Sequence, residues 1–436
     1  MIARDDNETD APAPYRAIGR WPYLAASIPL LLIEYAAALL PRVMAYQPSG
    51  SRSPIFSAWL EGNRFAILLA AIGAIVFACT ATLGWLATRR AATVGATGLT
   101  ASLAVVPWLQ LFVVPILAFR EPAERVSPGS LVALRGALWG LGIALAAEFV
   151  FTLAFGEYGI ALFAGSPFVV GLIAAYFAER DGHPHPFVAA QNALVLASAV
   201  LFGFAFEGLF CLVIAYPLAT VAALIGSAAG VPLARWRTRS ATALSSIALL
   251  PLLLIAETAA PPLAEFRDVR SVEVAAAPAS VWEAIVNMGT IREAPAAPFG
   301  WGLAYPVAGR IDGTGIGAVR LGVFSTGIAY ERVTRWEPGR ELWFDVLSDP
   351  PMMRETNPFG PVRSPHLEGY FATRTAHFTL TPLPGGRTKL TLATDHALML
   401  GPTTYFEPLA RWTVAENKRR VLQHFKSRAE RSVAAR

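Results

Sequence analysis

The sequence predicts a multi-pass α-helical membrane bundle of about eight spans, followed by an α+β domain in which a curved antiparallel sheet surrounds a long C-terminal helix. The first 260 residues hold 29 charged residues, whereas the remaining 176 hold 38. About a quarter of the residues in a typical soluble domain are charged. The shortage of charged residues in this chain therefore lies in its first 260 residues. Apolar stretches long enough to cross a bilayer also recur in this part. We therefore divide the chain into a polar tail over residues 1–20, a bundle over 21–260 and a soluble domain over 265–432.

Eight segments of the bundle are apolar enough to be expected as membrane spans. Five contain no charged residue, and three are short or are interrupted by one or two charges. Because lipid offers no hydrogen-bond partners, each span is expected to be a helix. The eight are Trp21–Leu40, Phe65–Thr88, Ala91–Phe119, Leu131–Phe155, Tyr158–Ala178, Pro186–Phe206, Gly208–Ala234 and Ser240–Ala256.

The charge and cysteine content exclude several classes of protein. The net charge is +5, but the excess is arginine at the ends of apolar runs, which is typical of membrane proteins and not of nucleic-acid binding. Cys79 and Cys211 each lie inside an apolar run, so neither a disulfide framework nor a zinc site is indicated. We expect no nucleic-acid partner, no metal and no cofactor.

Three acidic residues, Glu34, Glu148 and Glu207, interrupt the apolar runs. Intramembrane charges usually face the interior of a bundle and mark functional sites. For Glu207 two interpretations stay open. Glu207 and Gly208 can form the turn between two spans, with the carboxylate at the water interface. Alternatively, Glu207 belongs to a proton or substrate site, with Glu34 and Glu148 as candidate partners.

The distribution of arginine predicts the orientation of the bundle in the inner cell membrane. Arg235, Arg237 and Arg239 lie just before the last span, and the soluble domain lies just after it. Cytoplasmic loops carry the excess of basic residues. With eight spans, the soluble domain is therefore expected on the extracytoplasmic side. If the short segment Ser240–Ala256 does not cross the membrane, the soluble domain is expected on the cytoplasmic side.

The soluble part reads as a strand, a helix, several antiparallel strands and a long helix. The glycine-rich connection around Gly309–Gly317 is expected to form hairpin turns rather than a nucleotide-binding loop, because no helix follows it. A sheet and a helix in this order enclose an apolar cavity, which is a common kind of ligand site. The expected strands are Val269–Val274, Ala318–Thr326, Gly327–Trp336, Glu341–Leu347, Leu367–Leu383 and Arg387–Leu398, and the expected helices are Pro278–Val286 and Thr404–Ala429.

Four segments of the soluble part carry a family resemblance: Val272–Trp282, Phe324–Val346, His366–Phe371 and Val421–Lys426. Through them the chain resembles the START-like (SRPBCC) superfamily of polyketide cyclase/dehydrase and lipid-transport type, and the likeness extends over Val269–Glu430. It implies a helix-grip fold that holds a lipid or another hydrophobic molecule, but the superfamily includes carriers, cyclases and binding modules on one scaffold. The membrane half resembles the N-terminal regions of bacterial membrane proteins that carry this same domain.

The candidate ligand-binding residues of the soluble domain are polar or adaptable side chains near the expected cavity. His366 and Glu368 lie two apart at a strand start and can share one face, either as a rim hydrogen-bond pair, as a ligand contact or as an acid–base pair. Asp395 and His396 are adjacent, so on a strand they point to opposite faces and form no local dyad. The full set is Glu331, Met352, Met353, His366, Glu368, Tyr370 and Trp412.

Three functions remain open from the sequence. The first is a membrane-tethered module that binds a lipid or another hydrophobic small molecule, with membrane lipids as the other partner. The second is a transporter- or sensor-like bundle regulated by the soluble domain. The third is an enzyme of the cyclase or dehydrase type, for which the sequence contains no nucleophile elbow or phosphate loop. We predict no catalytic residue.

Overall fold

The computed structural model describes residues 18–45, 63–96, 98–106, 108–122, 129–148, 158–182, 186–204, 206–236, 243, 245–358, 362, 367 and 369–434. The chain forms two compact units. The helical unit comprises Met1–Glu257 together with Asn357–Val362. The C-terminal unit comprises Thr258–Thr356 and Arg363–Arg436.

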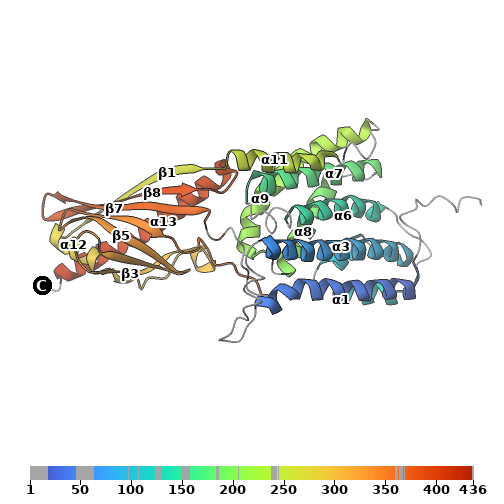
Figure 1. The fold of residues 1–436 in the computed structure, drawn as a ribbon, viewed down its shortest axis with the longest axis horizontal. Coiled ribbons are helices and arrows are strands. Elements are labelled where there is room, and N and C mark those ends of the chain that lie inside the picture. The colour runs from blue at the N-terminus through green and yellow to red at the C-terminus, as the bar shows by residue number, and fades with distance from the viewer. Residues whose placement is uncertain are drawn as a thin grey trace, which may run out of the picture. The chain divides into compact units, whose positions relative to one another are not determined.

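The helical unit is a bundle in which α1, α3, α6 and α7 lie side by side, each packed on the next (Figure 1). Helix α9 packs against α7, and α8 against α6 and α7. The elements are α1 (Arg20–Ala45), α3 (Asn63–Val94), α4 (Gly98–Ser102), η2 (Leu103–Val105), α5 (Gln110–Phe119), α6 (Gly129–Glu148), the π-helical turn η4 (Ala161–Gly165), α7 (Ser166–Arg180), α8 (Pro186–Gly203), α9 (Leu209–Arg235), η5 (Ser245–Ala248) and α11 (Leu249–Ala259).

The expectation of one continuous span over Ala91–Phe119 is wrong. This segment contains the end of α3, the short elements α4 and η2, and then α5. The backbone leaves the helical region at Gly95, where φ is 63°, and again at Trp108, where φ is 68°. A positive φ is incompatible with a continuing right-handed helix, so the run of apolar residues folds into several short pieces.

Helices α7 and α9 approach each other at small residues. A Cβ atom added at Gly226 would lie only 1.9 Å from the carbonyl oxygen of Phe168, and one added at Gly230 would lie 2.2 Å from that of Leu172. Ser227, between them, donates a hydrogen bond of 3.2 Å to the carbonyl oxygen of Gly171. Close backbone contact through a small-xxx-small pattern is the usual way in which helices associate in lipid.

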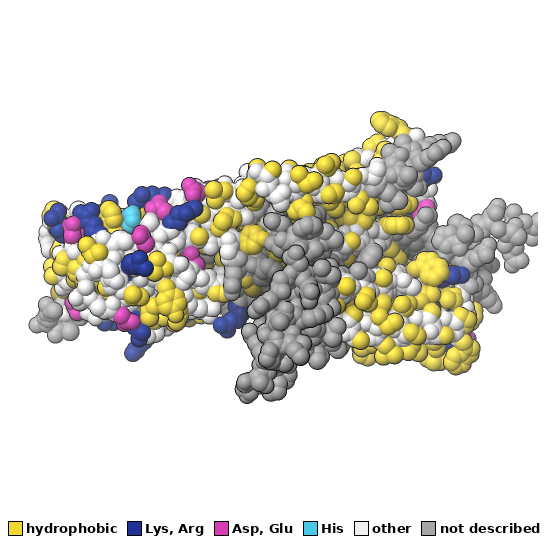
Figure 2. Space-filling view, in the orientation of Figure 1, with side chains coloured by type: hydrophobic (Ala, Val, Ile, Leu, Met, Phe, Trp, Pro, Cys, Tyr) yellow, Lys and Arg dark blue, Asp and Glu magenta, His cyan; other side chains and the backbone are white. Residues whose placement is uncertain are grey.

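Four described helical segments are long and apolar enough to cross a membrane. They are Arg20–Ala38, Ala161–Arg180, Pro186–Gly203 and Leu209–Arg235. Where Figure 2 shows the helical unit in colour, hydrophobic side chains are frequent and charged ones are few, whereas charged side chains are scattered over the visible face of the C-terminal unit. Large apolar side chains are exposed on several helices of the helical unit, for example Leu32, Phe112, Val213 and Leu252, each more than 60% exposed.

The C-terminal unit consists of an eight-stranded antiparallel sheet that curls around one long helix, α13 (Figure 1). The strand order is β1-β8-β7-β6-β5-β4-β3-β2. Helix α12 packs against α13, β7 and β8. The elements are β1 (Ala264–Val274), α12 (Pro278–Val286), β2 (Gly289–Thr290), η6 (Phe299–Trp301), β3 (Pro306–Asp312), β4 (Val319–Phe324), β5 (Ile328–Glu337), β6 (Glu341–Ser348), β7 (Phe371–Leu383), β8 (Arg387–Leu398) and α13 (Thr403–Ala434).

Most elements expected in this unit are confirmed, and the main differences concern β3 and β7. The helix Pro278–Val286 begins and ends at the expected residues. Gly309 belongs to β3, a strand that the glycine-rich composition concealed, and the β3–β4 hairpin turn contains Gly313, Gly315 and Gly317, all with positive φ. Strand β7 begins at Phe371, later than expected.

Alternation along the strands sends one set of side chains to the concave face, where α12 and part of α13 cover them. We call this region the packed end. Phe425 and Leu422 of α13 lie there, 0% and 3% exposed. The packed end also contains the following buried side chains of the sheet and of α12: Val274, Val281, Trp282, Ile285, Val333, Leu342, Phe344, Phe378, Leu380, Leu390 and Leu392.

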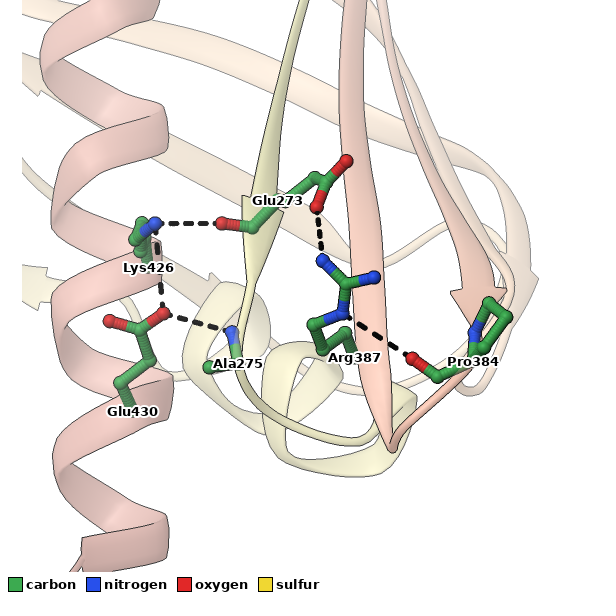
Figure 3. Close-up of polar contacts among 6 residues, drawn as sticks. All are labelled: Glu273, Ala275, Pro384, Arg387, Lys426 and Glu430. Atoms are coloured by element: carbon green, nitrogen blue, oxygen red, sulfur yellow. Dashed lines mark hydrogen bonds and ion pairs between the residues drawn. The ribbon is translucent and has the colours of Figure 1, made fainter.

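Polar contacts fix the C-terminal half of α13 to the sheet (Figure 3). Lys426 Nζ donates to the carbonyl oxygen of Glu273 at 2.9 Å, and Glu430 Oε1 accepts from the Ala275 amide at 2.9 Å. The Glu273 carboxylate in turn accepts a hydrogen bond of 2.7 Å from Arg387, just after the β7–β8 turn. These contacts hold the helix in register with β1.

Candidate functional site

The concave face carries polar and aromatic side chains beyond the packed end, opposite the first half of α13. The β1–β8 register pairs Phe266 with His396 and Asp268 with Thr394, and directly paired residues share a face. Lys418 of α13 reaches this region, because its ammonium group contacts Asp268. We call these five residues the polar end.

His396 is the centre of the polar end. Its ring lies between those of Phe266 and Phe371, at centroid distances of 5.1 and 5.2 Å, and the residue is only 5% exposed. A hydrogen bond of 2.5 Å joins Nε2 to Thr394 Oγ1, with donor and acceptor set by the tautomer. Nδ1 has no hydrogen-bond partner among the described residues. Buried polar atoms are nearly always paired, so Nδ1 is a place where a ligand or a water molecule would bind.

The environment keeps the His396 ring neutral. Burial lowers its pKa to about 3, and the nearby Lys418 ammonium group adds to this effect. Asp268 and Asp395 oppose the shift but do not overcome it. A neutral imidazole presents either one donor or one acceptor at Nδ1, which suits a hydroxyl or carbonyl group better than a charged one.

Lys418 is a buried lysine, 4% exposed, held by one residue of the sheet. Its Nζ donates to the Asp268 carbonyl oxygen at 2.5 Å and lies 3.1 Å from the Asp268 carboxylate. Burial lowers the pKa of Lys418 to about 8, and Asp268 limits the decrease. Asp268 thus helps Lys418 to keep its ammonium form at neutral pH.

A second buried charge pair lies on β4 and β5. Arg320 Nη1 donates to the Glu331 carboxylate, and both residues are less than 10% exposed. The guanidinium also lies 5.0 Å from the centroid of the Phe344 ring and 3.7 Å from Met288 Sδ. Glu331, expected as a ligand contact, is therefore occupied by an ion pair that borders the packed end.

Asp349 adds a second carboxylate near this pair. Its Oδ2 accepts a hydrogen bond of 2.7 Å from the Thr373 amide. Burial raises the pKa of Asp349 to about 6, and the charge of Glu331 adds to the increase. Thr373 pairs with His396 across β7 and β8, so Asp349 is anchored beside the polar end.

The other expected site residues lie in different settings. Met352 is held by its backbone, with hydrogen bonds to Ala304 and Leu367, and Met353 forms an isolated bridge with Leu303. The Tyr370 carbonyl accepts from the Met399 amide at 2.8 Å, and the exposed Trp412 stacks on Phe299 at 5.5 Å. His366 and Glu368 lie outside the described residues.

Sequence reasoning missed four members of the polar end, namely Phe266, Asp268, Lys418 and Thr394, and considered His396 only as a partner of Asp395. The alternation that separates His396 from Asp395 also places His396 on the buried face of β8, with Thr394 and Leu392. This pattern could have identified His396 as a buried residue of the site. The contact of Lys418 with Asp268 joins residues 150 positions apart, and no local pattern indicates it.

In the helical unit, Glu34 and Glu207 are buried and have different partners. Glu34 accepts hydrogen bonds from Thr80 and from Gln110, the latter at 3.0 Å. Glu207 accepts one of 3.2 Å from Tyr158. The side chain of Glu148 lies outside the described residues. Among the described residues, no group of three or more His, Cys, Asp or Glu could hold a metal ion.

Comparisons with known proteins concern the C-terminal part. No protein-family model matches the chain, and no curated protein matches its sequence. Among solved structures, the chain is similar to the Zhui aromatase/cyclase from a Streptomyces species, with 19% identity over 39% of this chain and 96% of that one, at a TM-score of 0.26. It is also similar to a Thermus thermophilus protein (14% identity, 39% and 99% covered, TM-score 0.25). A third is the Aha1 dimer from Colwellia psychrerythraea (13% identity, 37% and 96% covered, TM-score 0.23). At identities and scores this low, we draw no conclusion about ligand or activity from them.

Proposed function

We propose that the chain is a multi-pass membrane protein whose START-like C-terminal domain, residues 265–432, binds a lipid or another hydrophobic small molecule. The ligand would lie between the sheet and the first half of α13. The residues at the polar end support this placement, because the packed end is filled by the side chains of the fold's own core.

The observation that carries the proposal is the setting of His396. Its ring is held between two phenylalanines, which offer flat apolar walls, while Nδ1 lacks a partner. Other buried atoms of this domain, such as His424 Nδ1, also lack partners. His396 differs from His424 because aromatic walls and a buried lysine surround it. A mostly apolar site with a few placed polar groups is the usual design for binding a small molecule.

The membrane assignment is supported by the chemistry of the helical unit. Four described segments can cross a bilayer by length and composition, and an aqueous protein rarely exposes so extended an apolar surface. We further propose that the C-terminal domain lies on the extracytoplasmic side, which Arg235, Arg237 and Arg239 just before the last apolar helix favour. A reporter fused to the C-terminus that is active only in the cytoplasm tests the orientation: activity of this fusion contradicts it.

Native mass spectrometry of the full chain in detergent tests the binding proposal. We expect a co-purifying or added lipid to remain bound, and His396→Phe to weaken binding about tenfold through loss of one polar contact. His377→Phe is the matched control, because His377 stacks on Trp343 elsewhere in the sheet and is expected to leave binding unchanged. A chain that never carries lipid, or equal losses in both variants, contradicts the proposal.

A second candidate is a transporter- or sensor-like bundle, favoured by the buried carboxylates of Glu34 and Glu207. Buried ionisable groups within apolar helices commonly belong to ion or substrate pathways. If joint substitution of Glu34, Glu148 and Glu207 by Gln changes no flux in reconstituted vesicles, this candidate is wrong. The cyclase or dehydrase interpretation depends on His366 and Glu368, and we do not propose it.

A further inference from the structure

The chain contains three lysines, all in the C-terminal unit, and their settings differ. Lys389 is exposed on β8, and Lys426 lies on α13 with a side chain that is 35% exposed. Lys418 precedes Lys426 on the same helix, and its side chain is only 5% exposed. Lysine is almost never buried to this extent without a partner. The amine of Lys418 therefore occupies a place that the other two do not.

The attachment of α13 to β1 does not require a buried amine. Lys426 and Glu430 make this attachment nearer the surface, through hydrogen bonds of 2.9 Å to the backbone of Glu273 and Ala275 (Figure 3). Lys418 instead brings its amine between the helix and the sheet, where burial disfavours charge. A methionine of similar length would fill this space without a polar group. Lys418 thus retains a chemical group that packing alone does not call for.

Asp268 holds the amine of Lys418 through two oxygen atoms. Nζ donates to the Asp268 carbonyl oxygen at 2.5 Å and lies 3.1 Å from the Asp268 carboxylate. A carboxylate at this distance can accept a proton from the ammonium group, and it stabilises any positive charge that later forms on the nitrogen. Asp268 is therefore placed both as a proton acceptor and as a counter-ion.

Burial also changes the protonation of Lys418. It lowers the pKa of Lys418 from 10.5 to about 8, and the charge of Arg270 adds to the decrease, whereas Asp268 and Asp395 oppose it. At pH 7 about a tenth of Lys418 side chains carry a neutral amine, against about one in 3,000 for a lysine of ordinary pKa. The neutral amine is the nucleophilic form, and desolvated lysines of this kind form imines with carbonyl compounds.

The surroundings of Lys418 suit an apolar carbonyl compound. The charge of Lys418 lowers the pKa of the nearby His396, whose Nδ1 has no hydrogen-bond partner in the part of the chain that the structure describes. When Thr394 donates to Nε2, Nδ1 carries the ring proton and can donate to a carbonyl oxygen. The rings of Phe266 and Phe371 flank His396 as apolar walls. Exclusion of water by such walls favours an imine, because water is a product of its formation.

We propose that Lys418 forms an imine with a hydrophobic aldehyde bound at the polar end. The ammonium group passes one proton to the Asp268 carboxylate, and the Nζ lone pair then attacks the carbonyl carbon, whose oxygen accepts a hydrogen bond from His396 Nδ1. The oxygen leaves as water with two protons, one from Nζ and one returned by Asp268. The product is a protonated imine beside the Asp268 carboxylate, and no oxidant or reductant is consumed. The inference rests on the proposed function, because it names the class of ligand and its attachment.

Reductive trapping of the full chain in an amine-free detergent at pH 7 tests the proposal, with n-decanal as the probe and sodium cyanoborohydride as the reductant. Hydride converts the imine into a stable secondary amine, and peptide mass spectrometry locates the decyl group on one of the three lysines. If access from solvent decided the reaction, Lys389 and Lys426 would react first. We expect Lys418 to react at least about ten times faster than either of them.

Two variants and a competitor complete the test. Lys418→Arg keeps a cation for Asp268 and is expected to reduce decyl incorporation to the level of the exposed lysines, whereas the matched control Lys426→Arg leaves the labelling of Lys418 unchanged. Excess 1-decanol, which cannot form an imine, is expected to slow the labelling of Lys418 alone. Equal labelling of Lys418 and Lys426, or no effect of 1-decanol, overturns the proposal.

Native mass spectrometry separates this outcome from failure of the proposed function. Bound lipid without preferential labelling of Lys418 refutes the imine alone. Absence of both bound lipid and preferential labelling refutes the lipid site as well.

Discussion

The packed end and the polar end of the C-terminal unit share one sheet and one helix but differ in how their groups are satisfied. At the packed end, Leu422 and Phe425 pack against the apolar side chains of the sheet. At the polar end, Lys418 depends on Asp268, and His396 has one ring nitrogen without a partner. Burial of polar groups stabilises only when they are fully paired.

This difference separates the residues that hold the fold from those available for binding. Burial of apolar surface stabilises the fold by about 25 cal/mol per Å² and needs no particular orientation of the side chains. The packed end therefore loses stability when a side chain is truncated, but it offers no polar group for binding a ligand. The polar end is stabilised less by burial, and its polar side chains can form hydrogen bonds in defined directions. Substitutions at the two ends should therefore separate loss of stability from loss of binding.

The largest effect is expected from Phe425→Ala. Phe425 is fully buried and contacts Phe378 at a centroid distance of 5.6 Å, so truncation is expected to cost about 3–5 kcal/mol. Hydrogen exchange of the β7 and β8 amides in the full chain measures the change. Leu409→Ala, on the exposed first half of α13, is the control and should change protection by less than about 1 kcal/mol. Equal effects would show that the packed end is no special source of stability.

The buried pair at the border of the two ends gives the next effect. Arg320→Leu leaves the Glu331 carboxylate buried without its cation, which is expected to cost about 3 kcal/mol. The double substitution with Glu331→Leu removes both charges and should recover most of that loss. Urea unfolding of the C-terminal unit, followed by the same exchange experiment, measures both. If the double variant is as unstable as Arg320→Leu, the pair has a structural role beyond charge.

A smaller effect is expected from Asp349→Asn, and it depends on pH. The pKa of Asp349 in the folded chain is about 6, above its ordinary value of 3.8. Between these pH values the folded state binds more protons than the unfolded state, so the Asp349 contribution to stability falls as pH rises. Asparagine keeps an oxygen for the Thr373 amide without the charge. The variant should match the unmodified chain near pH 4 and exceed it by up to about 2 kcal/mol at pH 7.

Stability curves of both chains from pH 4 to pH 8 test this prediction. His396 titrates in part of the same range, with the opposite sign because its pKa is lowered, but it is present in both chains and cancels in their difference. A constant difference between the two curves contradicts the prediction.

The sequence predicted the C-terminal fold well because its signals are local. Alternation identified β5, β6 and β8 nearly to the residue, and the proline at the start of α12 marked the helix. Strand β3 was missed because Gly309 weakens the alternation, and its pairing with β4 is a property of the sheet. In the helical unit, hydropathy located the apolar runs but not the breaks at Gly95 and Trp108, where backbone conformation decides.

The candidate sites were harder to predict than the fold. Glu207 was identified because a charge inside an apolar run is conspicuous in the sequence, and Glu331 because it is a polar side chain near the expected cavity. Their partners, Arg320 and Tyr158, were not, because only the folded chain brings them together. The same holds for Lys418, whose partner lies on the first strand of the domain. Sequence therefore indicates which side chains are unusual, whereas the fold determines what each of them does.

The smallest effect is expected at the surface contacts shown in Figure 3. Arg387→Ala removes the ion pair with Glu273, in which both side chains are about half exposed to solvent. Because water screens such a pair, the loss is expected to be below about 0.5 kcal/mol and to shrink further in high salt. Exchange protection of β1 and β8 at low and high salt measures it. A loss as large as that of Arg320→Leu would mean that burial does not decide the strength of charge pairs in this domain, and the contrast between its two ends would then need another physical cause.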